Sequence, residues 1–277
     1  MKPFVVNSID AFFLLTVFGL GLPALCALAL HHIEQGLFGV LSRRFGVKAV
    51  VYLTGWLGTP VHELSHAALC PIFGHTINEF QPFKPDFETG TLGYVKHTPG
   101  PGIWSRLGGF FIGIAPLLGG SLALCLLTWL CTGVNLLAMT PALSAQANMA
   151  SPGETIYGFF RIALHTLGAL THMRYWFLWP VFVYGSLCIG AHMAPSGADL
   201  KNGLSGLVLL LVLFGLVSLT VGGLEALDVR VVTIGQLFYI LNLAVAPVVL
   251  LLMLSIVLNG ANLMLMWLLC SLPGGGA

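Results

Sequence analysis

A series of long apolar runs constrains this fold more than any other feature of the sequence. A transmembrane helix needs about 20 consecutive, mainly apolar residues. Six runs are close to or above that length, at about 11–30, 48–72, 103–131, 175–194, 204–222 and 233–258. Because backbone polar groups in lipid must be hydrogen-bonded internally, such runs fold as helices. We therefore predict an all-α polytopic protein of the cell membrane, with about six transmembrane helices.

Composition supports this class and gives the domain organisation. The chain is 57% hydrophobic and only 8% charged, which is far from the usual soluble range. Its net charge of +1 argues against a nucleic-acid partner. No soluble domain fits between the runs, so we predict one integral membrane domain over 1–277, with a core at 48–203 and accessory helices at 1–47 and 204–277. A short apolar piece at 261–272 is either an interfacial helix or the far half of a kinked last span.

One apolar run contains a group of ionisable residues that lipid packing does not require. Residues 62–66 read His-Glu-Leu-Ser-His. Histidines four residues apart lie on one face of a helix, so His62 and His66 can bind a single metal ion. Glu63 is then placed to act as a general base on a water held by that metal. The structural alternative is a pair of histidines hydrogen-bonded between helices, with Glu63 in a salt bridge.

Two segments between the apolar runs predict further structure. Residues 74–101 are rich in Gly, Pro, Thr and aromatic residues. Within them, 77–83 and 89–97 favour two extended pieces that pair as a small β-hairpin directly after the histidine motif. An ordinary interfacial loop is the alternative. Residues 154–172 have apolar side chains at helical spacing and predict a helix lying on the membrane or packed on the bundle.

A catalytic zinc usually has three protein ligands and one open position. Of the four aspartates, only Asp199 lies at a break between two apolar runs, beside Ser196 and Asn202. We take Asp199 as the third ligand. Its alternative role is to cap the following helix, which Ser196 could do instead. His192 is the competing ligand, although a lone membrane histidine more often bonds a neighbouring helix.

Together these features resemble the site-2 protease family of intramembrane zinc metalloproteases. The resemblance is carried by the histidine motif in a membrane helix, the Gly-rich hairpin after it and the late aspartate at a helix break. The small-residue segment FIGIAPLLGG at 111–120 is similar to one that the family carries after its hairpin. The likeness covers roughly 48–131 and 175–203, and the histidine motif is its specific part.

The resemblance implies that His62, His66 and Asp199 hold Zn²⁺ and that Glu63 is the catalytic base. It also implies that a substrate adds as a strand to the hairpin, so we expect substrate contacts from Thr91, Gly93, Tyr94 and Val95. The family usually has Asn-x-x-Pro before its aspartate and Gly directly after it. Here Pro195 has no such Asn before it and the next glycine is Gly203, so the chain resembles a divergent member. Asn202 and His97 are the candidates for stabilising the oxyanion.

The expected function is hydrolysis of peptide bonds in membrane-spanning or membrane-proximal protein substrates by metal-activated water. The expected partners are therefore the lipid bilayer and such a substrate. A zinc-dependent hydrolase of a lipid or a non-peptide amide is one alternative. A non-enzymatic metal-binding membrane protein or transporter is the other, but a transporter should carry acidic or His ligands on several spans.

Overall fold

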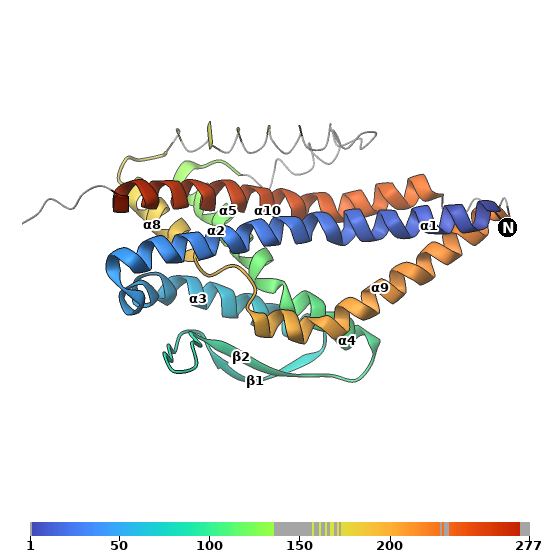
Figure 1. The fold of residues 1–277 in the computed structure, drawn as a ribbon, viewed down its shortest axis with the longest axis horizontal. Helices are drawn as coiled ribbons and strands as arrows, with labels where there is room; N and C mark the ends of the chain where they lie inside the picture. The colour runs from blue at the N-terminus through green and yellow to red at the C-terminus, as the bar shows by residue number, and fades with distance from the viewer. Residues whose placement is uncertain are drawn as a thin grey trace, which may run out of the picture.

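The computed structural model describes residues 2–135, 173–227 and 233–271, together with Val229 and single residues between 157 and 171. This part of the chain is mostly helical and has one two-stranded antiparallel sheet, as predicted (Figure 1). The helices are α1 (Lys2–Thr16), the π-helical turn η1 (Val17–Gly21), α2 (Leu22–Phe45), α3 (Val47–Ile72), α4 (Ile103–Gly113), α5 (Ala115–Thr132), α8 (Leu178–Gly190), α9 (Gly197–Ala226) and α10 (Ile234–Ser271). The strands are β1 (His75–Gln81) and β2 (Tyr94–Pro99).

Four helical segments of the described chain are long and apolar enough to cross a membrane, by length and composition. They are Val5–Phe45, Ala115–Thr132, Gly197–Ala226 and Tyr239–Ser271. The predicted number of six is not confirmed. The first predicted run, 11–30, is part of one long rod in which α1, η1 and α2 follow each other without a break (Figure 1).

The other predicted spans differ from the helices in the structure, each for its own physical reason. Helix α3 is 26 residues long, but the polar residues of its histidine motif lower its hydropathy. The run 103–131 is two helices, because the chain breaks at Ile114 just before Pro116. Helix α8 has 13 residues, which is short of the roughly 20 that a bilayer requires. The piece at 261–272 continues α10 through Ser271, and most of 154–172 lies outside the described residues.

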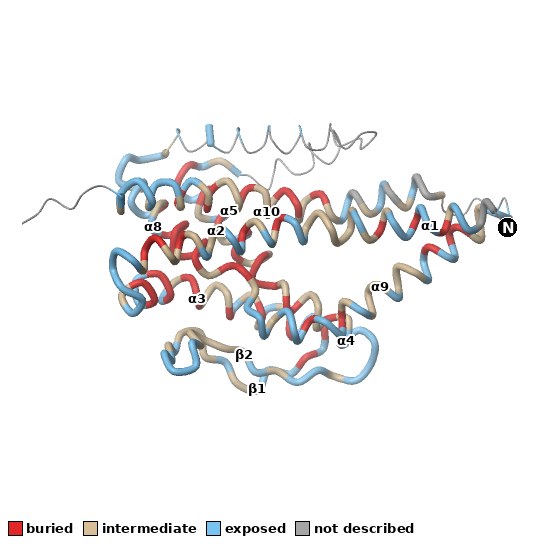
Figure 2. Tube along the Cα trace, in the orientation of Figure 1, coloured by how far each residue is buried: buried red, intermediate tan, exposed pale blue. Residues whose placement is uncertain are grey.

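The core lies where α2, α5, α8 and α10 meet. Helix α1 packs against α9, α2 against α10, and α3 against α5 and α8. Fully buried apolar side chains from α2, α5, α8 and α10 form the largest cluster, and the buried segments in Figure 2 gather in the same region. Among its members are Leu30, Leu124, Phe182 and Val249. Helix α3 touches this cluster through Val61 and packs against α8, and both helices lead into the site.

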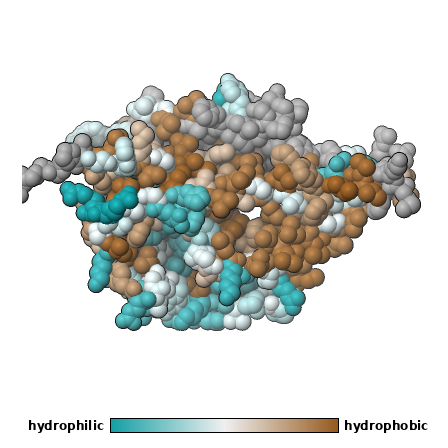
Figure 3. Space-filling view, in the orientation of Figure 1, coloured by the Kyte–Doolittle hydropathy of each residue, from teal (hydrophilic) through white to brown (hydrophobic). Residues whose placement is uncertain are grey.

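The hairpin lies along one side of the helices and follows α3 directly (Figure 1). Strands β1 and β2 pair antiparallel from His75 opposite Pro99 to Gln81 opposite Tyr94, so the predicted hairpin is confirmed. The register shifts between Ile77 and Glu79, which is a bulge in β1. Hydrophilic residues gather along the hairpin edge, whereas hydrophobic residues cover the end of the molecule formed by α1 and α9 (Figure 3).

Candidate metal centre

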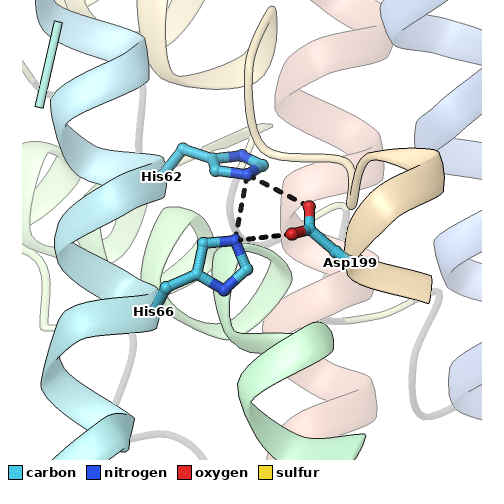
Figure 4. A group of neighbouring side chains, drawn as sticks. All are labelled: His62, His66 and Asp199. Carbon is cyan, nitrogen blue, oxygen red and sulfur yellow. Dashed lines mark hydrogen bonds and ion pairs between the residues drawn. The ribbon is translucent and has the colours of Figure 1, made fainter. Parts of the chain in front are cut away.

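The structure brings the three predicted ligands together. His62 and His66 lie one turn apart on α3, and Asp199 lies in the first turn of α9 (Figure 4). The Nε2 atoms of the two histidines are 3.2 Å apart. The Asp199 carboxylate reaches both rings, with Oδ2 at 3.4 Å from His62 Nε2 and Oδ1 at 3.2 Å from His66 Nε2. Within the described ranges, this is the one group of three or more His, Cys, Asp or Glu side chains that could hold a metal ion.

Backbone carbonyls determine which nitrogen of each ring carries the proton. His62 donates from Nδ1 to the carbonyl of His192 over 2.7 Å, and His66 donates from Nδ1 to the carbonyl of Ile112, also over 2.7 Å. A carbonyl accepts only, so each Nδ1 carries a hydrogen. In a neutral ring the Nε2 then has a free lone pair. Both lone pairs are therefore available to the space shared with Asp199.

The local sequence leaves both carbonyls without the usual helical donor. In an α-helix the Ile112 carbonyl would accept from the N–H four residues later, but that residue is Pro116, which has no N–H. The His192 carbonyl lies beyond the end of α8 at Gly190. Pro116, which has no part in the predicted chemistry, thus orients one of the two imidazoles.

This donor set fits a tetrahedral zinc ion. Ligand atoms about 2.0–2.1 Å from a tetrahedral Zn²⁺ are about 3.3–3.4 Å from each other. The separation of 3.2 Å between the two Nε2 atoms is close to that value, as are the distances of 3.4 and 3.2 Å from these atoms to the two oxygens of Asp199. Two imidazole lone pairs and a carboxylate facing one another repel unless a cation or a proton lies between them. Histidine ligands oriented by carbonyls are also typical of zinc sites.

Asp199 caps its helix and at the same time faces the two histidines. Ser196 is the N-cap of α9 and accepts a hydrogen bond from the Asp199 N–H at 3.2 Å, while Asp199 Oδ2 accepts from the Ser196 N–H at 2.7 Å. This capping box fixes the aspartate side chain at the start of the helix. Capping therefore positions the carboxylate toward the histidines and does not compete with that role.

His192 lies beside the three ligands but faces a different partner. Its Nε2 is 2.9 Å from the hydroxyl oxygen of Thr54, which itself donates to the Val50 carbonyl. The ring of His192 therefore donates to Thr54. His192 supports the ligand group through its backbone carbonyl, which accepts the hydrogen bond from His62.

The remaining predicted residues surround one cavity of about 980 Å³ next to the ligands. Glu63 is buried, with 7% of its surface exposed, and lines this cavity. The predicted substrate-contacting and oxyanion-stabilising residues line it as well: Thr91, Gly93, Tyr94, Val95, His97 and Asn202. The catalytic and substrate residues predicted from the sequence thus share a single space.

Glycines in the segment 111–120 allow the helices of the site to approach closely. A Cβ on Gly113 would lie 2.7 Å from the carbonyl oxygen of Asp199. A Cβ on Gly119 would lie 1.9 Å from the hydroxyl oxygen of Ser65, within the histidine motif. Larger residues at these two positions would push α9 and α3 away from α4 and α5.

Tyr94 and Lys96 tie the two strands together through Glu79. Lys96 forms a 2.8 Å ion pair with Glu79, and the Tyr94 hydroxyl donates a hydrogen bond to the same carboxylate. These contacts hold the pKa of Glu79 below its usual value, with the Lys96 bond as the larger cause. The Tyr94 hydroxyl is therefore engaged within the hairpin, and Tyr94 would meet a substrate with its ring or backbone.

Glu34 and His75 are among the cavity residues that sequence reasoning missed. Glu34 of α2 accepts a hydrogen bond from the Ala194 N–H at 2.9 Å, in the segment between α8 and Asp199. A carboxylate inside an apolar helix is itself a signal for function, and Glu34 has that signal. His75 of β1 is buried and contacts His97, but its partner lies 22 residues away and no local pattern marks the pair.

The comparisons with known proteins leave the site to be interpreted from its chemistry. No protein-family model, no curated protein and no solved structure matches this chain.

Proposed function

We propose that this chain is a multi-pass membrane protein that hydrolyses peptide bonds of membrane-spanning or membrane-proximal proteins, as a divergent relative of the site-2 proteases. The observation that carries the proposal is the orientation of the two imidazoles. His62 and His66 each use Nδ1–H on a backbone carbonyl, so both Nε2 lone pairs are free beside the Asp199 carboxylate. A buried HExxH helix with such a third ligand is typical of zinc hydrolases.

In this proposal the ligands and the base have separate tasks. His62, His66 and Asp199 hold Zn²⁺, which when bound supplies Lewis acidity and a water of lowered pKa. Glu63 is next to His62 in sequence and lines the cavity, where its carboxylate accepts a proton from the attacking water and delivers it to the leaving amine. Burial of Glu63 excludes bulk water from this proton transfer.

The hairpin supports a peptide as the substrate. Residues 90–97, at the end of the hairpin loop and the start of β2, line the cavity beside the ligands. Among the strands that the structure describes, β2 pairs with β1 on one edge only, so its other edge could pair with an extended chain. A membrane helix must unwind before its peptide bonds can reach the base, which favours substrates with weak helix-formers near the cleavage point.

The distribution of ligands argues against a transporter. A transport path needs ionisable or metal-binding groups in succession along several spans. In the part of the chain that the structure describes, His62, His66 and Asp199 form the one group of three or more side chains that could hold a metal ion. A single fixed site beside a carboxylate base suits hydrolysis better than it suits the transport of a metal ion.

Metal analysis of detergent-purified protein tests the proposal first. We expect about one zinc per chain in the wild type, and loss of zinc in both His62→Ala and Asp199→Ala. Zinc retained in Asp199→Ala would exclude the three-ligand site. Glu63→Gln is the matched variant, because it removes the base without removing a ligand.

Cleavage is tested separately with an unfolded, fluorescently labelled casein in detergent. The wild type should cleave it, EDTA should abolish cleavage, and added zinc should restore it. Glu63→Gln should retain zinc and lose at least about a hundredfold in rate, the lower range for general-base catalysis. A Glu63→Gln protein that cleaves at the wild-type rate would show that this carboxylate is not the base.

A further inference from the structure

A pair of histidines joins the two strands of the hairpin beside the metal ligands. His75 of β1 and His97 of β2 have their Nδ1 atoms 2.8 Å apart, with ring centroids 4.9 Å apart. Both residues line the cavity, but His75 is buried, with 7% of its surface exposed, whereas His97 is half-buried. His97 is therefore the more accessible ring of the pair in the space that a substrate would enter.

The protons of this pair follow from its one backbone partner. His75 Nε2 lies 2.9 Å from the carbonyl oxygen of Ser105, which can only accept, so His75 Nε2 carries a hydrogen. A neutral imidazole has one N–H, so His75 Nδ1 is an acceptor. The 2.8 Å contact then requires His97 to donate from its Nδ1. In that state His97 Nε2 has a lone pair and no hydrogen.

The surroundings favour two neutral rings. An imidazolium buried at His75 would have a carbonyl and another imidazole as its partners, and an unpaired buried charge is costly. Among the described residues, neither ring forms an ion pair with a carboxylate. Burial, and then the neighbouring His75 and His66, lower the pKa of His97, and these effects outweigh the opposing effect of Asp199.

The fold fixes where the free nitrogen can act. His97 lies opposite Ile77, at the register shift in β1, and bulges of this kind often redirect a side chain next to an active site. Its ring lines the same cavity as His66, Asp199 and Glu63. Within the described ranges Nε2 of His97 has no hydrogen-bond partner, so it is open to a bound substrate.

We propose that His97 binds the substrate through Nε2 as a hydrogen-bond acceptor for a backbone N–H near the scissile bond, and that His75 is the positioning residue that holds His97 in this tautomer. The inference deepens the proposed peptidase function and rests on it. It also changes the role expected for His97 from the sequence, because a neutral Nε2 without hydrogen cannot donate to an oxyanion. Asn202 is then the remaining candidate for that task.

Nitrogen-15 NMR of the histidine rings tests the tautomers directly. Protein labelled with ¹⁵N-histidine would be measured in lipid vesicles at pH 7.5, and His75→Gln and His97→Gln variants would assign the signals. We expect His75 protonated at Nε2 and His97 protonated at Nδ1. A His97 ring protonated at Nε2 would overturn the proposal. This measurement needs no substrate, so it stands even if the proposed protease activity is absent.

A chemical double-mutant cycle tests the substrate contact. The probe is a synthetic single-span peptide that the wild type cleaves, compared with peptides in which one backbone amide near the cleavage point is replaced by an ester, which lacks the N–H. At one position the ester should lower kcat/KM about five- to tenfold, the range for one hydrogen bond. His97→Phe should lower kcat/KM for the parent peptide by a similar factor and retain zinc. The two changes together should cost no more than either alone.

The positioning role of His75 has its own comparison. His75→Leu removes the acceptor for His97 Nδ1–H and should reproduce most of the His97→Phe loss, whereas His75→Gln keeps an acceptor oxygen and should restore part of it. Additive effects of the ester and His97→Phe at every position would overturn the substrate contact. A wild type that holds zinc but cleaves no peptide would contradict the proposed function and with it the substrate role of His97. The NMR result would still decide the tautomers.

Discussion

His66 donates a hydrogen bond from Nδ1 to the backbone carbonyl of Ile112 over 2.7 Å. This contact joins α3 to α4 and turns the free nitrogen of His66 toward Asp199 (Figure 4). The carbonyl lacks its usual helical donor because Pro116, four residues later, has no N–H, so it can accept from His66. The geometry of the ligand group therefore depends on a residue that is neither a ligand nor in contact with a substrate.

Pro116→Ala should weaken metal binding. Alanine restores an N–H that competes with His66 for the Ile112 carbonyl, so the imidazole would be less firmly oriented. We expect zinc affinity to fall about tenfold, measured by competition with a chelating dye. Pro247→Ala, inside α10, is the matched control and should leave zinc affinity unchanged. Equal affinities for Pro116→Ala and the wild type would show that the carbonyl does not orient the ring.

Ser196→Ala should reduce both stability and zinc affinity. The change removes the cap that accepts from the Asp199 N–H, which costs about 1 kcal/mol and loosens the first turn of α9. Thr233 and Gln236 form a similar reciprocal pair at the start of α10, so Thr233→Ala is the control. Thermal unfolding should shift in both variants, but a zinc titration should change only for Ser196→Ala. A zinc affinity that falls equally in Thr233→Ala would point to a general loss of stability.

The parts of the site that sequence predicted are those with a local pattern. The helical spacing of His62 and His66 and the aspartate at a helix break are visible in the chain, and the Gly-rich segment after the motif predicts the hairpin. The predicted number of spans is not confirmed, because apolar runs do not mark where a helix breaks. The run 103–131 is mainly apolar, yet Pro116 and the turn at Ile114 divide it into α4 and α5.

The parts that sequence could not predict depend on contacts between distant residues. The tautomers of His62 and His66 are determined by carbonyls 130 and 46 residues away. The His75–His97 pair exists because of the register of the hairpin, which the alternation of side chains alone did not fix. Glu34 has a signal of its own, an acidic residue in an apolar helix, but its partner Ala194 is 160 residues away.

Glu34 should position the segment that leads to Asp199. Its Oε2 accepts from the Ala194 N–H at 2.9 Å, and this bond anchors the turn between α8 and α9 to α2. We expect Glu34→Ala to lower zinc affinity about threefold to tenfold, because the ligand carboxylate is then less well fixed. Glu34→Gln retains an acceptor oxygen and should stay close to the wild type. Gln35→Ala, on the exposed side of the same helix, should have no effect.

The charge of Glu34 is distinguished from its hydrogen bond by the same variants. If Glu34→Gln lost as much zinc affinity as Glu34→Ala, the negative charge would be the stabilising feature. The measurement is zinc competition at pH 7.5 in detergent, with far-UV circular dichroism to show that each variant keeps its helical content.

Acid should destabilise the hairpin through the His75–His97 pair. Burial and the neighbouring His75 hold the pKa of His97 below its ordinary value. As pH falls below about 6.5, the unfolded chain takes up this proton before the folded protein does. The free energy of unfolding therefore declines with falling pH from that point.

The variant His97→Gln lacks the titrating group, so the melting temperature of this variant should fall less than that of the wild type between pH 8 and pH 5.5. The comparison uses EDTA-treated protein, because metal binding is itself pH-dependent. Parallel melting curves of the two proteins across this range would show that His97 does not contribute to the pH dependence.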